Sequence, residues 1–566
     1  AEQTLDDALD IAERELALVL RSGTDTDHAV YFSRNAYVLD TALNFGFNYA
    51  PNSGSAARLA LTTLLRRKGR MLDAAAAALA TIRSKLSPDD KKILDELNSA
   101  RAQLAKLVNA GPSATGGDGD AYGKEVAALE EKVQKLELQV SKKSAAYRTV
   151  TLPIELTAIQ KVIPSDARLV EIVNYQPWDP KAPYTINVKL KPRHYAAYIV
   201  GTKGDPSVVE LGEAAPIDKA VEEFRKAVAD PDNDRASDLG NALYKLTMAK
   251  IVGKLGGSTN ILIAPDGALN VVPFSALVDD SKQYLIKKYT FTYLTSGRDL
   301  LRLSVKTKSQ GGGVVFADPK FDSTTPTPGD AGTTRGRRSA DLRSLRWVPL
   351  PGTGQEADAL VKTMKGLKVY RGDQATEGQL KSLHAPKILH LATHGFFLPD
   401  APPPPEADKM QAQAPTSSSA ASEAYENPLL RSGLALAGAN KLSSGTDDGV
   451  LTALEASGLD LWGTKLVVLS ACETGVGKVS NGEGVYGLRR SLVIAGAESL
   501  VMTLWQVDDF ATKDLMAGYY KKLAAGKPRS AALREIQLEL AAQEKYAHPF
   551  YWASFLPAGA LTPIKD

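Results

Sequence analysis

Apolar residues recur at helical spacing through the first 150 residues of the chain. This spacing of three and four positions runs through residues 8–20, 28–47 and 56–86, and an Asn-Ser-Gly break falls at 52–54. Each segment therefore predicts a helix with one apolar face. We expect an all-α region over residues 1–149.

Two longer apolar stripes complete this region. Ser87, Pro88 and the two acidic residues after them predict a helix start, with serine as the cap and proline in the first position. A Gly-rich segment, 111–123, separates the two stripes. Their apolar positions are Ile93, Leu97, Ala100, Leu104 and Leu107, then Val126, Leu129, Val133, Leu136 and Val140. This pattern predicts an antiparallel helical hairpin with a coiled-coil-like seam.

From residue 150 onward the pattern changes to short apolar runs that are typical of strands. The strand-like runs are 169–175, 186–191, 195–201, 208–212 and 260–267, and helix-like runs cover 216–229 and 235–255. This part of the chain is expected to contribute a sheet and helices. It offers no credible catalytic pair of its own.

Two apolar runs in the last third end next to reactive side chains. The run 388–397 contains His394 and Gly395, and the run 466–469 leads to Cys472, the only cysteine of the chain. Both runs read as strands buried on both faces, as in a parallel sheet. If they are parallel strands of one sheet, their carboxyl ends share an edge, and His394 and Cys472 can face each other across it. That is the nucleophile and base arrangement of a cysteine hydrolase.

The segments around these runs predict further elements. Glycines after Cys472 allow tight backbone next to the thiol, a helix-like run covers 485–495, and a strand is expected over 499–504. Two loops rich in Gly, Pro or Ser, at 323–344 and 401–427, interrupt the pattern. The second loop lies between the two apolar runs, so it must leave the shared edge undisturbed.

Composition and charge indicate the cellular compartment of the protein and the classes of partner it is expected to bind. The net charge is +3 with 23% charged residues, so bulk electrostatics imply neither a nucleic-acid nor a membrane partner. One cysteine cannot form an internal disulfide, which suits a reducing cytosol and keeps the thiol free. No apolar run approaches 18 residues, and the acidic start of the chain is unlike a signal peptide. We expect a cytoplasmic protein.

The sequence contains no complete motif for cofactor binding or for another class of hydrolase. The His390–His394 spacing resembles a zinc-binding helix but lacks the glutamate after the first histidine, and only six histidines exist. Phosphate-loop, dinucleotide and GxSxG patterns are also incomplete. We expect no metal and no other cofactor. A lone cysteine is more often a small buried residue than a nucleophile, so spacing alone does not decide the chemistry.

A family resemblance strengthens the catalytic interpretation. The segments LHLATHGFF (389–397), VVLSACETGVGKVSNGEGVYGLRR (467–490), AGAESLVMTLWQVDD (495–509) and HPFYWASFLPAG (548–559) resemble a CHAT domain, the bacterial relative of caspases and separases in peptidase clan CD. Further segments at 263–277, 350–360 and 371–383 also fit, and 65–74 resembles the tetratricopeptide-like helices that often precede such domains. No clean 34-residue repeat is present.

The resemblance implies a fold and a domain organisation. It implies an α/β class with a caspase-like sheet and flanking helices, in which a non-catalytic half, 150–320, packs beside a catalytic half, 321–566. The helical region, 1–149, precedes both.

The resemblance also implies roles for single residues. Cys472 would be the nucleophile and His394 the general base and acid, with backbone N–H groups of Gly395 and Cys472 forming the oxyanion hole. His390 is expected to be a core or supporting histidine. Glu473, beside the nucleophile, either orients neighbouring groups or is a solvated loop acid.

Specificity residues are expected in the segment 504–509. It resembles the separase segment that supplies an acid to the pocket for a basic P1 side chain, so Asp508 or Asp509 could pair with Arg or Lys. For one of the two, the alternative is the N-cap of a helix over 511–523.

These features favour a cysteine endopeptidase that cleaves a protein substrate. Family association suggests a bacterial defence or cell-death system, with an activator or regulatory protein bound through the N-terminal helices. Two alternatives remain, a catalytically silent scaffold and a thiol amidase or acyltransferase acting on a small substrate.

Overall fold

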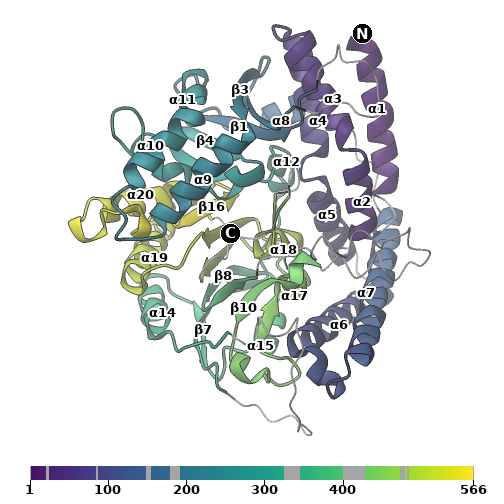
Figure 1. Cartoon of the computed structure of the whole chain (residues 1–566). Helices are drawn as coiled ribbons and strands as arrows, with labels where there is room; N and C mark the ends of the chain where they lie inside the picture. Colours follow the sequence, from purple (N-terminus) through teal and green to yellow (C-terminus); the bar gives the residue numbers. More distant parts are fainter. Residues whose placement is uncertain are drawn as a thin grey trace, which may run out of the picture.

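The architecture comes from a computed structural model of the chain (Figure 1). The structure describes residues 2–20, 24–84, 87–147, 154–178, 191–323, 345–398, 427–471, 478–480 and 484–564. Residues 186–190 of the predicted strand 186–191 and most of the two loops at 323–344 and 401–427 lie outside these residues. None of the described helices is long and apolar enough to cross a membrane.

The N-terminal region is helical, as predicted, and lies along one side of the molecule (Figure 1). Its helices are α1 (Glu2–Val19), α2 (Asp25–Arg34), α3 (Ala36–Asn44), α4 (Gly54–Arg67), α5 (Arg70–Ser84), α6 (Pro88–Ala110) and α7 (Gly119–Tyr147), with a π turn, η1 (Phe45–Tyr49), after α3. The helix expected over 28–47 is instead α2 and α3. In the same way, the single helix expected over 56–86 is instead two helices, α4 and α5. The break falls at Lys68 and at Gly69, whose φ of +67° is a conformation that favours glycine.

Lys68 breaks the helix because its side chain turns into the protein. Its Nζ lies 2.8 Å from the carboxylate of Glu171, and neither side chain is exposed. The same Nζ donates to the carbonyls of Ile172 (2.7 Å) and Ala264 (2.8 Å), on two strands of the large sheet. The second Glu171 oxygen accepts the N–H of Gly297. One fully buried ion pair therefore joins the helical region to the sheet.

The hairpin of α6 and α7 has the predicted start and seam. Ser87 and Asp90 form a reciprocal capping box at the start of α6, and Gly111 ends the helix with φ +62°. The stripe residues at its seam are buried, among them Leu97, Ala100, Leu104, Val133 and Leu136. α7 begins at Gly119, inside the Gly-rich segment that was expected to be the connection.

The central element is an 11-stranded sheet, in the order β3-β2-β1-β4-β5-β16-β15-β12-β8-β6-β7. Its strands are β1 (Ala167–Tyr175), β2 (His194–Val200), β3 (Ser207–Glu213), β4 (Asn260–Ala264), β5 (Thr290–Tyr293), β6 (Gly311–Pro319), β7 (Lys368–Gly372), β8 (Pro386–Ala392), β12 (Leu466–Ser470), β15 (Ser499–Thr503) and β16 (Phe555–Gly559). The mixed α/β class and the helical region before it are confirmed.

Strand direction reverses in the middle of the sheet. β1, β4, β5 and β16 run parallel to one another, whereas β15 runs antiparallel to β16 and parallel to β12, β8, β6 and β7. The two parallel sets therefore place their carboxyl ends on opposite edges of one sheet. Strands from residues 150–320 and strands from the last third of the chain share this sheet, and β6 lies among the latter, between β8 and β7.

Helices cover both sets of strands. They are α8 (Leu156–Val162), α9 (Ala214–Val228), α10 (Ala236–Leu246), α11 (Met248–Ile251), α12 (Asp299–Leu303), α14 (Pro351–Thr363), α15 (Glu377–Lys381), α17 (Ala453–Ala456), α18 (Leu488–Ala495), α19 (Asp509–Ala524) and α20 (Arg529–Ala541). Two helix predictions were too long. The run 235–255 ends its first helix at Leu246, and the run 485–495 starts as a strand, β14 (Gly484–Tyr486), before α18.

The helical hairpin packs against the last third of the chain near α15 and α17 (Figure 1). Asn109 of α6 donates to the buried carboxylate of Asp448 (2.9 Å), and Arg101 donates to Ser457 (3.1 Å). Arg83 of α5 donates to backbone carbonyls at 458, 459 and 495. One large hydrophobic core includes residues of α5, α6, α7 and both sets of strands, so these parts form a continuous packed body.

Candidate functional site

The neighbouring strands β8 and β12 set the geometry of the candidate site. They are parallel, with Ala392 paired to Ser470 at their carboxyl ends. Every residue of β12 is buried, as expected for a strand covered on both faces. His394 follows Ala392 by two positions, and Cys472 follows Ser470 by two positions in the sequence. Cys472 and Glu473 lie outside the described residues.

His394 is half buried just beyond β8 and has a defined set of neighbours. Its Nε2 lies 2.8 Å from the backbone carbonyl of Val348, and its ring lies 5.2 Å from that of Phe321 and 5.4 Å from that of Trp347. A carbonyl can only accept, so Nε2 carries the proton and donates it. The neutral ring then has its lone pair on Nδ1, which leaves that atom as the base.

Backbone hydrogen bonds also fix His394. Its carbonyl accepts the N–H of Ala435, and the next residue, Gly395, begins β9 (Gly395–Phe397). β9 pairs with β10 (Ser432–Ala435), which pairs with β11 (Val450–Thr452), in a small antiparallel sheet. Gly395 is opposite Leu434 in this ladder. The backbone next to the histidine is therefore part of a hydrogen-bonded sheet.

The two acids of the specificity segment have different positions. Asp508 is the N-cap of α19, where its carboxylate accepts the N–H of Ala511 (2.8 Å). Asp509 is exposed in the first turn and lies against Gly352, at whose position a Cβ would be 2.5 Å from the Asp509 carboxylate. Burial raises the pKa of Asp509, and Asp508 raises it further, whereas His394 lowers it. Of the two acids, Asp509 is therefore the one whose charge acts on His394.

The pKa of His394 responds to the same surroundings. Burial lowers it below the usual range, while the Val348 carbonyl and the Asp509 carboxylate act in the opposite direction. The net direction is downward. As the pH is lowered, the His394 ring therefore stays neutral, and able to accept a proton, at pH values where a free histidine is already protonated.

A buried network lies beneath the site. His390 of β8 is fully buried, with Nδ1 2.9 Å from the Tyr520 hydroxyl and Nε2 2.9 Å from Oε1 of Glu356. The other oxygen of Glu356 accepts from the Ser470 hydroxyl at 3.0 Å. The contact between His390 Nε2 and Glu356 Oε1 is close but does not have hydrogen-bond geometry, so Glu356 is hydrogen-bonded to Ser470 and in contact with His390. One carboxylate from α14 thus bridges the carboxyl ends of β8 and β12.

Several of these contacts had no signal in the sequence. The Val348 carbonyl and the Glu356 carboxylate come from segments 46 and 114 residues away from their partners. Glu356 does fall in the segment 350–360 that resembles the family, which marked the region without indicating its contact. Among the described residues, no group of three or more His, Cys, Asp or Glu side chains is placed to hold a metal ion.

Comparison with known proteins assigns the chain to a family. The model of the CHAT domain matches residues 237–560, more than half of the chain. The chain belongs to the CHAT domain family. The match includes β8, β12 and the segments between and after them, so the candidate site lies inside the CHAT domain.

Two curated relatives match a similar share of the chain. Tetratricopeptide repeat protein 28 of Homo sapiens is 27% identical over 340 residues, and its Mus musculus counterpart is 27% identical over 339 residues. Each match covers 56% of this chain but 13% of the relative, so the chain spans about an eighth of the length of these relatives.

Two kinds of solved structure are similar to this CHAT protein at low identity. The separase in a Saccharomyces cerevisiae separase–securin complex is similar at 9% identity and a TM-score of 0.39, over 93% of this chain and 37% of that one. The Arg-specific cysteine proteinase gingipain R is similar at 8% identity and a TM-score of 0.31, over 61% of this chain and 74% of that one.

Proposed function

We propose that this CHAT protein is a cysteine endopeptidase with Cys472 as the nucleophile and His394 as the general base and acid. The observation that carries the proposal is the pairing of Ser470 with Ala392, because the sequence continues to a cysteine two positions after one and a histidine two positions after the other. Family membership supports the same assignment.

The proposed reaction begins with proton transfer. Nδ1 of His394 accepts the thiol proton while Nε2–H donates to the Val348 carbonyl, which keeps the ring in the productive tautomer. The thiolate then adds to a peptide carbonyl, and the backbone N–H groups of Gly395 and Cys472 stabilise the oxyanion. The C–N bond breaks, and the imidazolium protonates the leaving amine.

The second half of the reaction releases the acid product. Water attacks the thioester carbonyl as Nδ1 of His394 accepts one of its protons. The C–S bond breaks, the new carboxylic acid leaves, and the proton returns to the sulfur. Atoms balance without a cofactor, because the overall change is hydrolysis of one amide bond.

Asp509 is proposed as the residue that favours a basic P1 side chain. Asp508 uses its carboxylate to cap α19, whereas Asp509 is exposed in the first turn of α19 and its charge acts on His394. An Arg or Lys side chain there would form a charge-assisted hydrogen bond with Asp509. The carboxylate would also stabilise the imidazolium.

The proposal includes a protein that regulates the peptidase through the N-terminal helices. Ile11 and Leu18 of α1 and Tyr37 of α3 are large apolar residues with more than half of their surface exposed. Exposed apolar residues of this kind are available for a protein contact.

The test compares the purified chain with Cys472→Ala and His394→Ala on fluorogenic peptides with Arg, Lys or Leu at P1. We expect both variants to lose at least about a thousandfold in kcat/KM, because removing one member of a catalytic pair removes most of the chemistry. Asp509→Asn should lower kcat/KM for Arg and Lys peptides more than for Leu, and Asp514→Asn on the same helix should not. Cleavage by Cys472→Ala at the parent rate would refute the proposal.

A further inference from the structure

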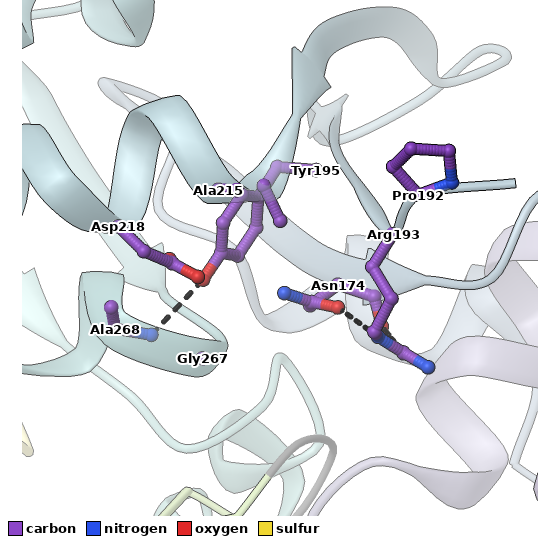
Figure 2. Close-up of a pocket in the computed structure, with 9 residues that line it drawn as sticks. Asn174, Pro192, Arg193, Tyr195, Ala215, Asp218, Gly267 and Ala268 are labelled. Carbon is purple, nitrogen blue, oxygen red and sulfur yellow. Dashed lines mark hydrogen bonds between the residues drawn. The ribbon is translucent and has the colours of Figure 1, made fainter.

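The non-catalytic half contains a polar cavity at the carboxyl ends of two parallel strands. It has a volume of about 310 Å³ and is lined by Asn174, Pro192, Arg193, Tyr195, Ala214, Ala215, Asp218, Gly267 and Ala268 (Figure 2). Asn174 is near the end of β1, and Gly267 follows the end of β4, its parallel neighbour. Ligands of open α/β sheets bind at such strand ends.

The cavity lies away from the candidate peptidase site. β1 and β4 point in the opposite direction to β8 and β12, so their carboxyl ends are on the other edge of the sheet. None of the lining residues was assigned a role from the sequence, because they come from four separate segments of the half without a catalytic pair.

One wall of the cavity is cationic. Arg193 donates through Nε to the Asn174 side chain and through Nη2 to the Asn174 carbonyl, at 2.7 Å. Its Nη1 group has no hydrogen-bond partner within the described part of the chain. The first turn of α9 also borders the cavity at Ala214 and Ala215, and the N–H of Ala214 donates to the Arg193 carbonyl (2.7 Å), which holds the Arg193 backbone at this wall. A guanidinium favours an anionic group such as a carboxylate.

The opposite wall is anionic. The Tyr195 hydroxyl donates to Oδ1 of Asp218 (2.7 Å) and accepts the N–H of Ala268 (3.0 Å), as Figure 2 shows. Gly267 permits this contact, because a Cβ there would lie 2.2 Å from the Tyr195 oxygen. The second Asp218 oxygen, Oδ2, has no hydrogen-bond partner in the described segments. Burial raises the pKa of Asp218, so its carboxylate is poorly compensated by the protein alone.

We propose that this cavity binds a small zwitterion of the amino-acid type, with its carboxylate on Arg193 and its ammonium on Asp218. The two charges of the ligand match the two walls. The volume is at the lower end of the range for small-molecule sites and suits a ligand of this size. The Tyr195 ring, Pro192 and the alanines form the apolar part of the lining.

The experiment is calorimetric titration of the full chain with each common L-amino acid, then β-alanine and γ-aminobutyrate. We expect saturable 1:1 binding of at least one zwitterion, and the separation of charge in the best ligand distinguishes α-amino acids from longer ones. Glycinamide, acetate and inorganic phosphate each lack one of the two features and should bind about tenfold more weakly or worse.

Variants assign the binding to this cavity. Arg193→Gln and Asp218→Asn should each weaken binding by about tenfold or more, whereas Lys219→Gln and Glu223→Gln, exposed on α9 outside the lining, should not. Ala215→Trp fills the cavity without removing a hydrogen-bonding group and should abolish binding if Arg193→Gln proves unstable. Cys472→Ala should bind as the parent does, which separates this site from peptidase activity.

Three results would overturn the proposal. One is that no zwitterion binds. Another is that Arg193→Gln, Asp218→Asn and Ala215→Trp, all folded, bind as the parent does. The third is that phosphate binds as tightly as any zwitterion and depends on Arg193 but not on Asp218, which would make the cavity an anion site.

Discussion

Single carboxylates make the side-chain contacts at the carboxyl ends of β8 and β12. Glu356 contacts His390 on one strand and Ser470 on the next, so one side chain fixes two strand ends that lead to the proposed catalytic residues. Asp508 and Asp509 are adjacent in sequence but differently placed, because Asp508 caps α19 whereas Asp509 is exposed and its charge acts on His394. Each carboxylate has its role because of the hydrogen-bond donors around it.

Replacing Glu356 by Gln should disturb this arrangement while preserving volume. An amide has no charge and one acceptor oxygen where the carboxylate has two, so it cannot keep both the hydrogen bond from Ser470 and the close contact with His390, at a cost of about 1–3 kcal/mol in the free energy of unfolding. We also expect slower alkylation of Cys472 by iodoacetamide, a reaction that is measured independently of peptidase activity. Asp358→Asn, exposed on the same helix, is the control. Unchanged unfolding and alkylation in Glu356→Gln would show that the bridge has no positioning role.

At the scale of single residues, the sequence predicted which residues lie at the candidate site better than it predicted the groups that they contact. The apolar run before His394 identified a buried strand end, and β8 is such a strand. The Val348 carbonyl and Glu356 could not be predicted, because backbone atoms carry no sequence signal and the contacts depend on how distant elements pack. For Asp508 and Asp509 the two possible roles were recognised, but only the position of α19 assigns the cap to Asp508. Cys472 as nucleophile remains a prediction.

Individual elements show where periodicity is sufficient and where it fails. The α6–α7 hairpin was predictable because its stripes, cap and glycine all agree. The break between α4 and α5 was missed, because the apolar pattern continues through Lys68 and a lysine is normally solvent-exposed. Burial of its ammonium depends on Glu171 and two carbonyls of the sheet. The tertiary contact therefore overrides the local preference for one long helix.

Lys68→Met should be strongly destabilising. It leaves Glu171 as a buried carboxylate without its cation, which typically costs about 3–5 kcal/mol. Urea unfolding measures the loss. Adding Glu171→Gln should recover part of it, because the amide oxygen still accepts from Gly297 and no charge remains. Lys92→Met, on the exposed face of α6, should have little effect. A double variant less stable than Lys68→Met would contradict the ion-pair explanation.

On the scale of the whole molecule, the helical region and the CHAT domain meet at a buried acidic cluster. Asp448 and Glu377 are surrounded by Asp447, Glu455 and Lys381, and Asn109 reaches Asp448 from α6. Burial and the neighbouring Glu455 raise the pKa of Asp448 to about 6, and burial raises that of Glu377 well above its usual value. The folded protein therefore holds these acids more readily in protonated form than the unfolded chain does.

This contact should make stability depend on pH in a defined direction. The pKa of Asp448 is 3.8 in the unfolded chain and about 6 in the folded protein. Protonation of Asp448 therefore contributes its full stabilisation of the folded state below about pH 3.8, and this contribution is lost as the pH rises through about 6. The shift at Asp448 corresponds to about 3 kcal/mol. Asp448→Asn removes the titration, and its amide can pair with Asn109 after an amide flip. We expect the variant to gain stability relative to the parent at pH 7.5 and to lose that advantage below about pH 4, by urea unfolding.

A matched variant tests whether the effect comes from burial. Asp514→Asn removes a carboxylate that is only partly buried on α19, and its stability relative to the parent should not vary over the same pH range. An Asp448→Asn advantage that persists unchanged at low pH would point to packing instead of charge.

The reversal between β16 and β15 also bears on how the two proposed binding sites could influence each other. A peptide at one rim and a zwitterion at the other would never touch, so mutual exclusion by overlap is ruled out and simultaneous occupancy is sterically free. Any influence of one site on the other would have to pass through the shared sheet, in which β16 pairs with β5 on one side and with β15 on the other. A small molecule acting there would be a remote effector and could not act as a competitive inhibitor.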